Sequence, residues 1–245
     1  MLLPSTLALN VGTVNIECPA SSAALPNMPR STRARAPARY HHGDLRAALA
    51  EAALRILVSR GEAEVSLREV ARAVGVSHAA PYRHYPNREA LLADLAAGGF
   101  ERLGQALAAL PGDADAGRHF VAMARAYVRF AQAEPAVYRL MFGPMVRKAD
   151  HPVLAEAGYR TLDALRAVLC ALGVPAPASA ETLAAWSLAH GLAQLLIDQR
   201  LEPDPTHDAP LDADTLVQQA AALFLAGVRA GQPGAPRPAR HSAPR

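Results

Sequence analysis

The sequence is poor in residues that several protein classes require. Its 245 residues include only two cysteines, Cys18 and Cys170, which are too far apart for a CxxC metal site or a compact disulfide framework. Aromatic residues make up 5% of the chain and β-branched residues are sparse, which disfavours β-sheets. We expect Cys170 to be a thiol in a helix core, Cys18 to be an incidental thiol in a tail, and the compartment to be the reducing cytoplasm.

Sequence motifs of the common enzyme classes are also missing. We find no glycine-rich phosphate loop, no HExxH, no GxSxG and no CxxC. The adjacent His41 and His42 have no acidic or thiol cluster near them in the sequence, so they do not predict a metal site. No run approaches the roughly 20 apolar residues that a membrane-spanning helix needs. The sequence therefore predicts no enzyme, no cofactor, no metal and no membrane partner.

Both ends of the chain read as disordered. Residues 1–39 contain scattered prolines without periodicity, and residues 231–245 form a proline-rich basic tail. The first 27 residues lack the basic start of a signal peptide, and our hypothesis is that translation begins naturally at Met28. The arginines of residues 30–39 form either a solvated arm or a basic arm that contacts DNA phosphates or the minor groove.

What the chain has in abundance is alanine, leucine and arginine, which favour helices. Apolar residues recur at helical spacing over most of its length. The helices predicted from this spacing and from capping residues cover residues 44–59, 66–74, 77–85, 87–110, 117–133, 135–142, 152–172, 179–200 and 212–230.

Positive charge is concentrated near the N-terminus. From Arg30 to Arg88 the chain has eleven arginines and five acidic residues, a net charge of +6, although the whole chain carries only +3. Basic residues gathered in one small region indicate a polyanionic partner such as DNA.

Residues 66–85 have the layout of a helix-turn-helix. Ser66 and Glu69 form a capping box, in which the serine hydroxyl accepts from the Glu69 N–H and Glu69 reaches back. Gly75 suits the left-handed turn that ends this helix. Ser77 is a natural N-cap for a third helix that ends near Tyr85. Such a second helix exposes polar side chains and fits the major groove of DNA.

The segment LREVARAVGVSHAAPYRHYPNREALL resembles the DNA-binding domain of the TetR family. The similarity rests on Gly75-Val76-Ser77, Tyr82-Arg83-His84-Tyr85 and Asn87-Arg88-Glu89, and extends over about sixty residues from Tyr40 to Arg102. It implies an all-α chain. A three-helix DNA-binding domain in residues 40–88 would be followed by a helical ligand-binding and dimerisation domain in residues 89–230.

The resemblance also implies which residues contact DNA. They lie before the first helix, at the start of the second helix, and in or just after the recognition helix: Tyr40, His41, Ser66, Arg68, Ser77, His78, Ala79, Tyr82, His84 and Arg88. Tyr85 is expected in the core. Pro81 replaces a commoner aliphatic residue, so the recognition helix either begins one residue later or is strained in its first turn.

The C-terminal half resembles a TetR subgroup whose C-terminal domain is named for tryptophan, histidine and glycine residues, here Trp186, His190 and Gly191. A polar stripe, Ser187, His190, Gln194 and Asp198, runs along the same helix. These groups either bond one another or a partner subunit, which we favour for His190, or help to line a ligand pocket. The candidate pocket residues are Met123, Tyr127, Phe130, Tyr138, Met141, Tyr159, Trp186, His190 and Gln194.

The helix at 179–200 is apolar on nearly all sides and must be covered on two of them. One side packs on its own core. The simplest way to bury the second side is contact with a second subunit, with the helix at 212–230 alongside. The alternative is that the helix is fully internal in a monomer.

These features predict a DNA-binding transcriptional regulator. Its partners would be double-stranded operator DNA, a second copy of itself and a small-molecule effector of unknown identity. We expect repression rather than activation only because repression is the more common role in the TetR family. Two alternatives are a helical enzyme or carrier with an incidental helix-turn-helix, and a regulator that binds DNA without a ligand.

Overall fold

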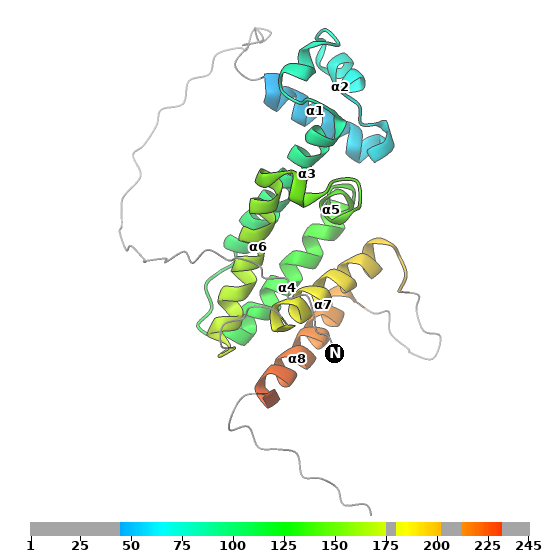
Figure 1. Cartoon of the computed structure of the whole chain (residues 1–245). Coiled ribbons are helices and arrows are strands. Elements are labelled where there is room, and N and C mark those ends of the chain that lie inside the picture. Colours follow the sequence, from blue (N-terminus) through cyan, green and yellow to red (C-terminus); the bar gives the residue numbers. More distant parts are fainter. Residues whose placement is uncertain (1–44, 175–179, 202–211, 232–245) are drawn as a thin grey trace, which may run out of the picture. The chain divides into compact units, whose positions relative to one another are not determined.

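The computed structural model describes residues 45–174, 180–201 and 212–231 (Figure 1). Within these ranges every regular element is helical, which confirms the predicted all-α class. Tyr40, His41, the predicted N-terminal arm and residues 232–245 of the predicted tail lie outside the described residues. The elements in chain order are α1 Leu45–Arg60, η1 Glu62–Glu64, α2 Leu67–Val74, η2 Ala80–Arg83, α3 Arg88–Ala108, α4 Ala116–Ala133, α5 Pro135–Phe142, η3 Lys148–Asp150, α6 Pro152–Ala171, α7 Ala180–Ile197 and α8 Ala213–Gly231.

Local capping chemistry fixes the ends of α2. The Ser66 hydroxyl accepts from the Glu69 N–H at 3.2 Å, as predicted. The carboxylate of Glu69 bonds Arg72 instead of reaching back to Ser66. Gly75 takes a left-handed conformation with φ of 79°, and its N–H donates to the carbonyls of Ala71 and Arg72. A residue with a Cβ is strained in this conformation, so glycine is what allows α2 to end here.

The recognition element is shorter than predicted. A third helix capped by Ser77 was expected, but only the single 3-10 turn η2 forms, and it begins at Ala80. Pro81 lies in its first turn and is buried. Proline has no N–H to donate and crowds the preceding turn, so a regular helix from Ser77 is disfavoured. Residues 78–79 form turns, and the Ala80 N–H bonds the Ser77 carbonyl at 3.0 Å.

Helix α3 connects the helix-turn-helix to the rest of the chain. The Asn87 side chain caps its N-terminus by accepting from the Ala90 N–H at 2.8 Å. The helix contacts α1 near its start and packs along α5 and α6 farther on. A Cβ at Gly99 would lie only 2.7 Å from the Met141 sulfur and from Val137 Cγ1, so glycine permits α3 and α5 to pack this closely.

Helix α4 is the centre of the C-terminal part and contacts α3, α5, α6, α7 and α8. Its apolar face is buried through Phe120, Met123, Tyr127 and Phe130. The Phe120 ring stacks on Phe224 of α8 with centroids 5.1 Å apart. Arg125 and Arg129 of α4 add polar contacts to Gln218 and Asp214 of α8.

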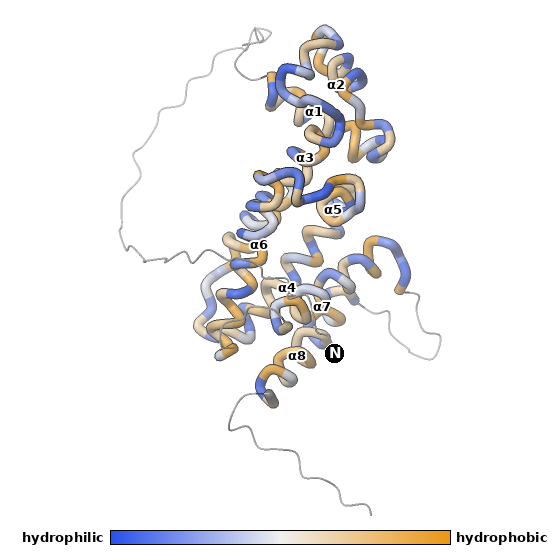
Figure 2. The backbone as a smooth tube through the Cα atoms, viewed as in Figure 1, coloured by the Kyte–Doolittle hydropathy of each residue, from blue (hydrophilic) through white to orange (hydrophobic). Residues whose placement is uncertain are grey.

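Helices α7 and α8 leave part of their apolar surface uncovered. Figure 2 shows hydrophobic residues recurring along both helices. On α7 only Thr182, Ala185 and Ala193 are buried, whereas Leu183 and Leu195 are exposed. Leu223 of α8 is 76% exposed.

Cys170 differs from its expected position. It lies near the end of α6 and is exposed, not in the core. The buried residues Val168 and Leu169 precede it directly, so the helical phase turns Cys170 outward.

Candidate nucleic-acid interface and ligand pocket

The segment around η2 presents an exposed polar surface. Ser77, His78, Ala79, Tyr82 and Arg83 are all exposed, although they lie next to the buried Pro81 and Tyr85. Tyr82 is 54% exposed, although its ring is large and partly apolar. Side chains that point outward around a short turn are available to a partner.

The remaining predicted DNA contacts occupy different environments. Arg68 is exposed on the first turn of α2. Ser66 is partly buried and its hydroxyl already caps α2, while His84 is partly buried at the end of η2.

Arg88 is engaged within the protein. Its Nε donates to the Val65 carbonyl at 2.7 Å, and Nη2 donates to the Glu62 carbonyl at 2.7 Å. Nη2 also lies 3.4 Å from the Glu62 carboxylate. Arg88 therefore ties the start of α3 to the loop between α1 and α2, a role that its expected phosphate contact does not suggest.

Tyr85 belongs to the core, as predicted. Its hydroxyl donates to Asp94 at 2.6 Å, and Arg46 donates to the other oxygen of the same carboxylate at 2.7 Å. Burial, followed by the bond to Asp94, raises the pKa of Tyr85 far above its ordinary value. This network joins α1, the segment that follows η2, and α3.

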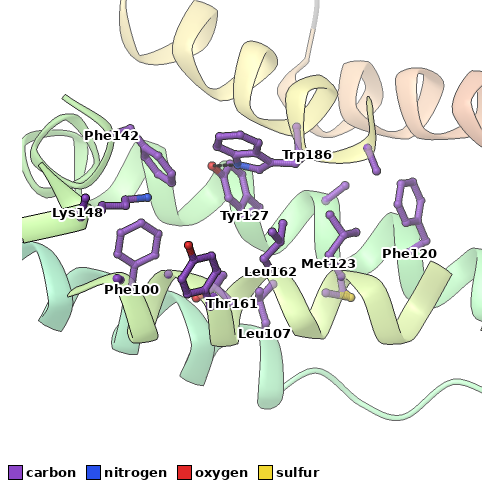
Figure 3. Close-up of a pocket in the computed structure, with 18 residues that line it drawn as sticks. Phe100, Leu107, Phe120, Met123, Tyr127, Phe142, Lys148, Thr161, Leu162 and Trp186 are labelled. Carbon is purple, nitrogen blue, oxygen red and sulfur yellow. Dashed lines mark hydrogen bonds between the residues drawn. The ribbon is translucent and has the colours of Figure 1, made fainter. Parts of the chain in front are cut away.

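A largely apolar cavity of about 280 Å³ lies between α3, α4, α6 and α7 (Figure 3). Six of the chain's twelve aromatic residues line it: Phe100, Phe120, Tyr127, Phe142, Tyr159 and Trp186. The other lining residues are Leu107, Met123, Ala124, Lys148, Ala149, Ala155, Gly158, Thr161, Leu162, Leu165, Ala185 and Ala189. An apolar cavity with few polar groups is the usual form of a small-molecule site.

The predicted ligand residues divide into two groups. Met123, Tyr127, Tyr159 and Trp186 line this cavity. Phe130, Tyr138, Met141, His190 and Gln194 do not, although the first three are buried nearby in α4 and α5. Gln194 donates to Asp198 at 2.6 Å, and Asp198 in turn accepts from Arg139.

Tyr138 and His190 stand directly behind the cavity wall. Trp186 Nε1 donates to the Tyr127 hydroxyl at 3.3 Å, and that hydroxyl lies 3.2 Å from the hydroxyl of Tyr138. The Nδ1 atom of His190 is 2.6 Å from the Tyr138 oxygen and 3.1 Å from the Tyr127 oxygen. We call these four residues the α4–α5–α7 network. It gives His190 partners on α4 and α5, whereas the predicted partners were polar neighbours on its own helix or a second subunit.

Titration behaviour in the α4–α5–α7 network follows from burial. Desolvation raises the pKa of Tyr127 to about 12 and that of Tyr138 further. Burial, with a smaller effect from the charge of Lys148, lowers the pKa of His190. The network therefore holds two protonated tyrosines and favours a neutral histidine.

Sequence reasoning missed several cavity residues, most notably Lys148, Phe100 and Phe142. Phe100 and Phe142 come from α3 and α5, whose helical spacing identifies a buried face but not which cavity it borders. Lys148 carried a recognisable signal, because it is the only lysine in the sequence.

A second hollow adjoins the first between α3, α4 and α6. It shares Phe100, Leu107, Met123 and Thr161 with the aromatic cavity and is bordered by polar groups, including Glu101 and Arg160. His119 also borders it, and its buried Nδ1 has no hydrogen-bond partner in the described structure.

Two further findings concern the described residues only. No three His, Cys, Asp or Glu side chains in these ranges are grouped as a metal site would require. No helix there is both long and apolar enough to cross a lipid bilayer.

Two protein-family models match the chain. Residues 49–95 match the bacterial regulatory proteins of the tetR family, and residues 120–224 match the tetracyclin repressor-like C-terminal domain. The chain belongs to the TetR family. As a TetR-family protein it is a DNA-binding transcriptional regulator and not an enzyme, which sets aside the enzyme alternative.

Several solved structures share the fold of this chain. A protein of unknown function from Rhodococcus sp. RHA1 is 36% identical, with a TM-score of 0.64, and the alignment covers 77% of this chain and 97% of that one. A transcriptional regulator from the same organism is 25% identical, with a TM-score of 0.56 and coverages of 74% and 96%. The TetR-family regulator PfmR from Thermus thermophilus is 20% identical, with a TM-score of 0.51 and coverages of 73% and 97%, and shares the fold. None of the curated proteins matches the chain.

Proposed function

We propose that this TetR-family regulator is a homodimeric repressor that leaves its operator when a small molecule enters the aromatic cavity. Residues 40–88 form its DNA-binding domain, and residues 89–230 bind the effector and dimerise. The cavity is the observation that carries the proposal, because a regulator without a ligand has no need to keep about 280 Å³ of aromatic-lined space open.

In this proposal the exposed side chains around η2 face the major groove. Ser77, His78, Ala79 and Tyr82 are nearest the bases, and Arg68 at the start of α2 contacts phosphate. Ala79 offers only a methyl contact, for example to thymine, so much of the sequence preference comes from DNA shape.

The α4–α5–α7 network provides a route from the cavity to the DNA-binding domain. Tyr127 and Trp186 line the cavity and bond Tyr138 and His190 behind it. Tyr138 lies on α5, which contacts both α3 and α1. A ligand that displaces Tyr127 therefore shifts α5 and, through it, the helices that hold η2. To act as an effector, the ligand must bind the two dimer conformations with different affinities.

Dimerisation is assigned to the uncovered side of α7 and α8. The exposed Leu183, Leu195 and Leu223 are large apolar side chains on two neighbouring helices, and a second copy would remove them from water. The two helices from each subunit would form a four-helix interface.

The test is binding of the full chain to its own upstream DNA over a range of salt concentrations. Specific binding should weaken as salt rises. The logarithm of the binding constant should fall by roughly 0.9 per phosphate contact for each tenfold increase in salt concentration, which is the salt slope. Arg68→Ala should lower that slope by about two in a dimer, because each subunit loses one contact. Arg147→Ala removes another exposed arginine far along the chain and is the control. Equal, sequence-independent binding by all three proteins would refute the DNA-binding assignment.

A regulator that binds DNA without an effector is the second candidate. The separating measurement is a screen of small molecules for release of the operator. If compounds bind the cavity and none of them weakens DNA binding, the effector role is wrong and the constitutive regulator stands.

A further inference from the structure

Among the described residues, Lys148 is the one cation that lines the aromatic cavity. It lies in η3, and its Nζ is 4.3 Å from the ring centroid of Phe100 and 5.0 Å from that of Phe142. In Figure 3 the side chain enters the cavity where these two rings lie, while Phe120 and Met123 lie toward the opposite end. The ammonium group is therefore at one end of an elongated apolar space.

The choice of lysine at this position stands out against the rest of the chain. Of the 25 basic residues, 24 are arginines, and Lys148 is the only lysine. An ammonium is a compact point charge on a flexible stem, whereas the planar guanidinium is larger and fixed in shape. A lysine can thus enter a narrow cavity and turn its three N–H donors toward a ligand.

In the described part of the chain, no carboxylate pairs with Lys148. The nearest acidic residue in its own turn, Asp150, faces Arg147 at 3.6 Å. Burial lowers the pKa of Lys148, as expected for an ammonium without a counter-ion. Only the two aromatic faces stabilise its charge, and they do so less strongly than a carboxylate would in the same apolar surroundings.

The other polar groups at the cavity do not supply that counter-ion. Tyr127 stays protonated, since burial raises its pKa, and Tyr159 and Thr161 contribute hydroxyl groups and no carboxylate. His190, behind the wall, is itself disfavoured as a cation by burial and by the charge of Lys148.

We propose that the effector is an elongated apolar molecule with a single carboxylate at one end, and that this carboxylate pairs with Lys148. The inference rests on the proposed ligand-responsive function and narrows its ligand class. The aromatic and aliphatic walls receive the apolar body, and the carboxylate accepts from the ammonium between Phe100 and Phe142. A neutral ligand leaves the buried charge unpaired, and a cationic ligand is repelled by it.

The chain contains its own reporter for this test. Trp186 is the only tryptophan, and it lies in the cavity wall. Its fluorescence can follow binding to the full chain without any DNA. The probes are decanoate, decanol and decylamine, which share an apolar tail and differ in the charge of the end group, each used below its micelle concentration.

Decanoate should bind at least tenfold more tightly than decanol, and decylamine should bind most weakly. Lys148→Met keeps an unbranched apolar side chain of similar length and should bring decanoate and decanol to equal affinity. Arg147→Met removes the neighbouring charge, which is 77% exposed, and should leave the preference unchanged.

The possible outcomes separate this inference from the proposed function. Equal affinity of wild type for decanoate and decanol overturns the carboxylate assignment, while the cavity remains a ligand site. A preference for decanoate that survives Lys148→Met also overturns it. If wild type prefers decanoate and Lys148→Met abolishes that preference, the inference is supported, whether or not decanoate releases the operator. Release of the operator tests only the proposed function.

Discussion

At the scale of single residues, Arg88 has a structural role that its position in the family motif conceals. Its guanidinium bonds the carbonyls of Val65 and Glu62 and so joins the start of α3 to the loop before α2. Arg88→Ala should lower the free energy of unfolding by about 2 kcal/mol, because two carbonyls lose a charged donor. Urea denaturation measures this change.

The matched control for that prediction is the exposed Arg147. Arg147→Ala should change the free energy of unfolding by less than about 0.5 kcal/mol. Under conditions in which the variant is folded, Arg88→Ala should also leave the salt dependence of DNA binding unchanged. An unchanged stability with a reduced salt slope would instead make Arg88 the phosphate ligand that the resemblance implies.

His190 makes stability depend on pH. Burial lowers its pKa in the folded state below the ordinary value of about 6.5, so the unfolded chain takes up this proton first as the pH falls. The free energy of unfolding should therefore decrease as pH falls below about 6.5, down to the lowered folded-state pKa. His190→Gln should flatten this part of the curve. Thermal unfolding from pH 5 to pH 8 measures the difference, and parallel curves for the two proteins would contradict the prediction.

At the scale of elements, the contact between α3 and α5 depends on Gly99. Gly99→Ala should destabilise the protein by about 1–3 kcal/mol, because the new methyl overlaps Met141 and Val137. Gly104→Ala, on the same helix, meets no atom within 4 Å and should stabilise it by about 0.5–1 kcal/mol. Both substitutions improve helix propensity equally. The difference between the two variants in the free energy of unfolding, measured by denaturation, therefore reports the packing overlap alone. A similar shift for both variants would show that the two helices separate easily.

Elements set by local chemistry could be predicted from the sequence, and those set by tertiary packing could not. Ser66 caps α2 as predicted, and Asn87 caps α3 where a helix was predicted to begin, because a cap involves atoms only three residues apart. The recognition element was predicted as a helix from Ser77, yet Pro81 limits it to one 3-10 turn. Pro81 was identified as unusual, but choosing between a strained helix and a later start requires knowing that its ring is buried.

The residues of the aromatic cavity were likewise predicted only in part. Met123, Tyr127, Tyr159 and Trp186 were predicted as pocket residues, and they line the cavity. Tyr138 and His190 do not line the cavity but are hydrogen-bonded to Tyr127, which does. Whether a residue lines the cavity or lies behind it depends on how α4, α5 and α7 pack together. Lys148 lies outside the long helices, where periodicity carries no information.

At the scale of the whole molecule, the exposed leucines of α7 and α8 predict self-association. Leu223→Asp places a charge on the most exposed of them and should shift the protein from dimer to monomer. Val153→Asp on α6, at a site 65% exposed, is the control and should stay dimeric. Light scattering after size-exclusion chromatography measures the mass. Wild type that elutes as a monomer would remove the dimer from the proposed function.

Helix α3 also has a mechanical consequence. It runs unbroken from Arg88 at the helix-turn-helix to Phe100 in the cavity wall, a distance of roughly 18 Å at about 1.5 Å per residue. A lever of that length that tilts by about 5° at the cavity moves its far end by roughly 1.5 Å. Hydrogen bonds to phosphate weaken steeply over such a displacement. If the proposed effector tilts α3 at the cavity, the stiffness of this helix would carry that small movement to DNA contacts that the effector does not touch.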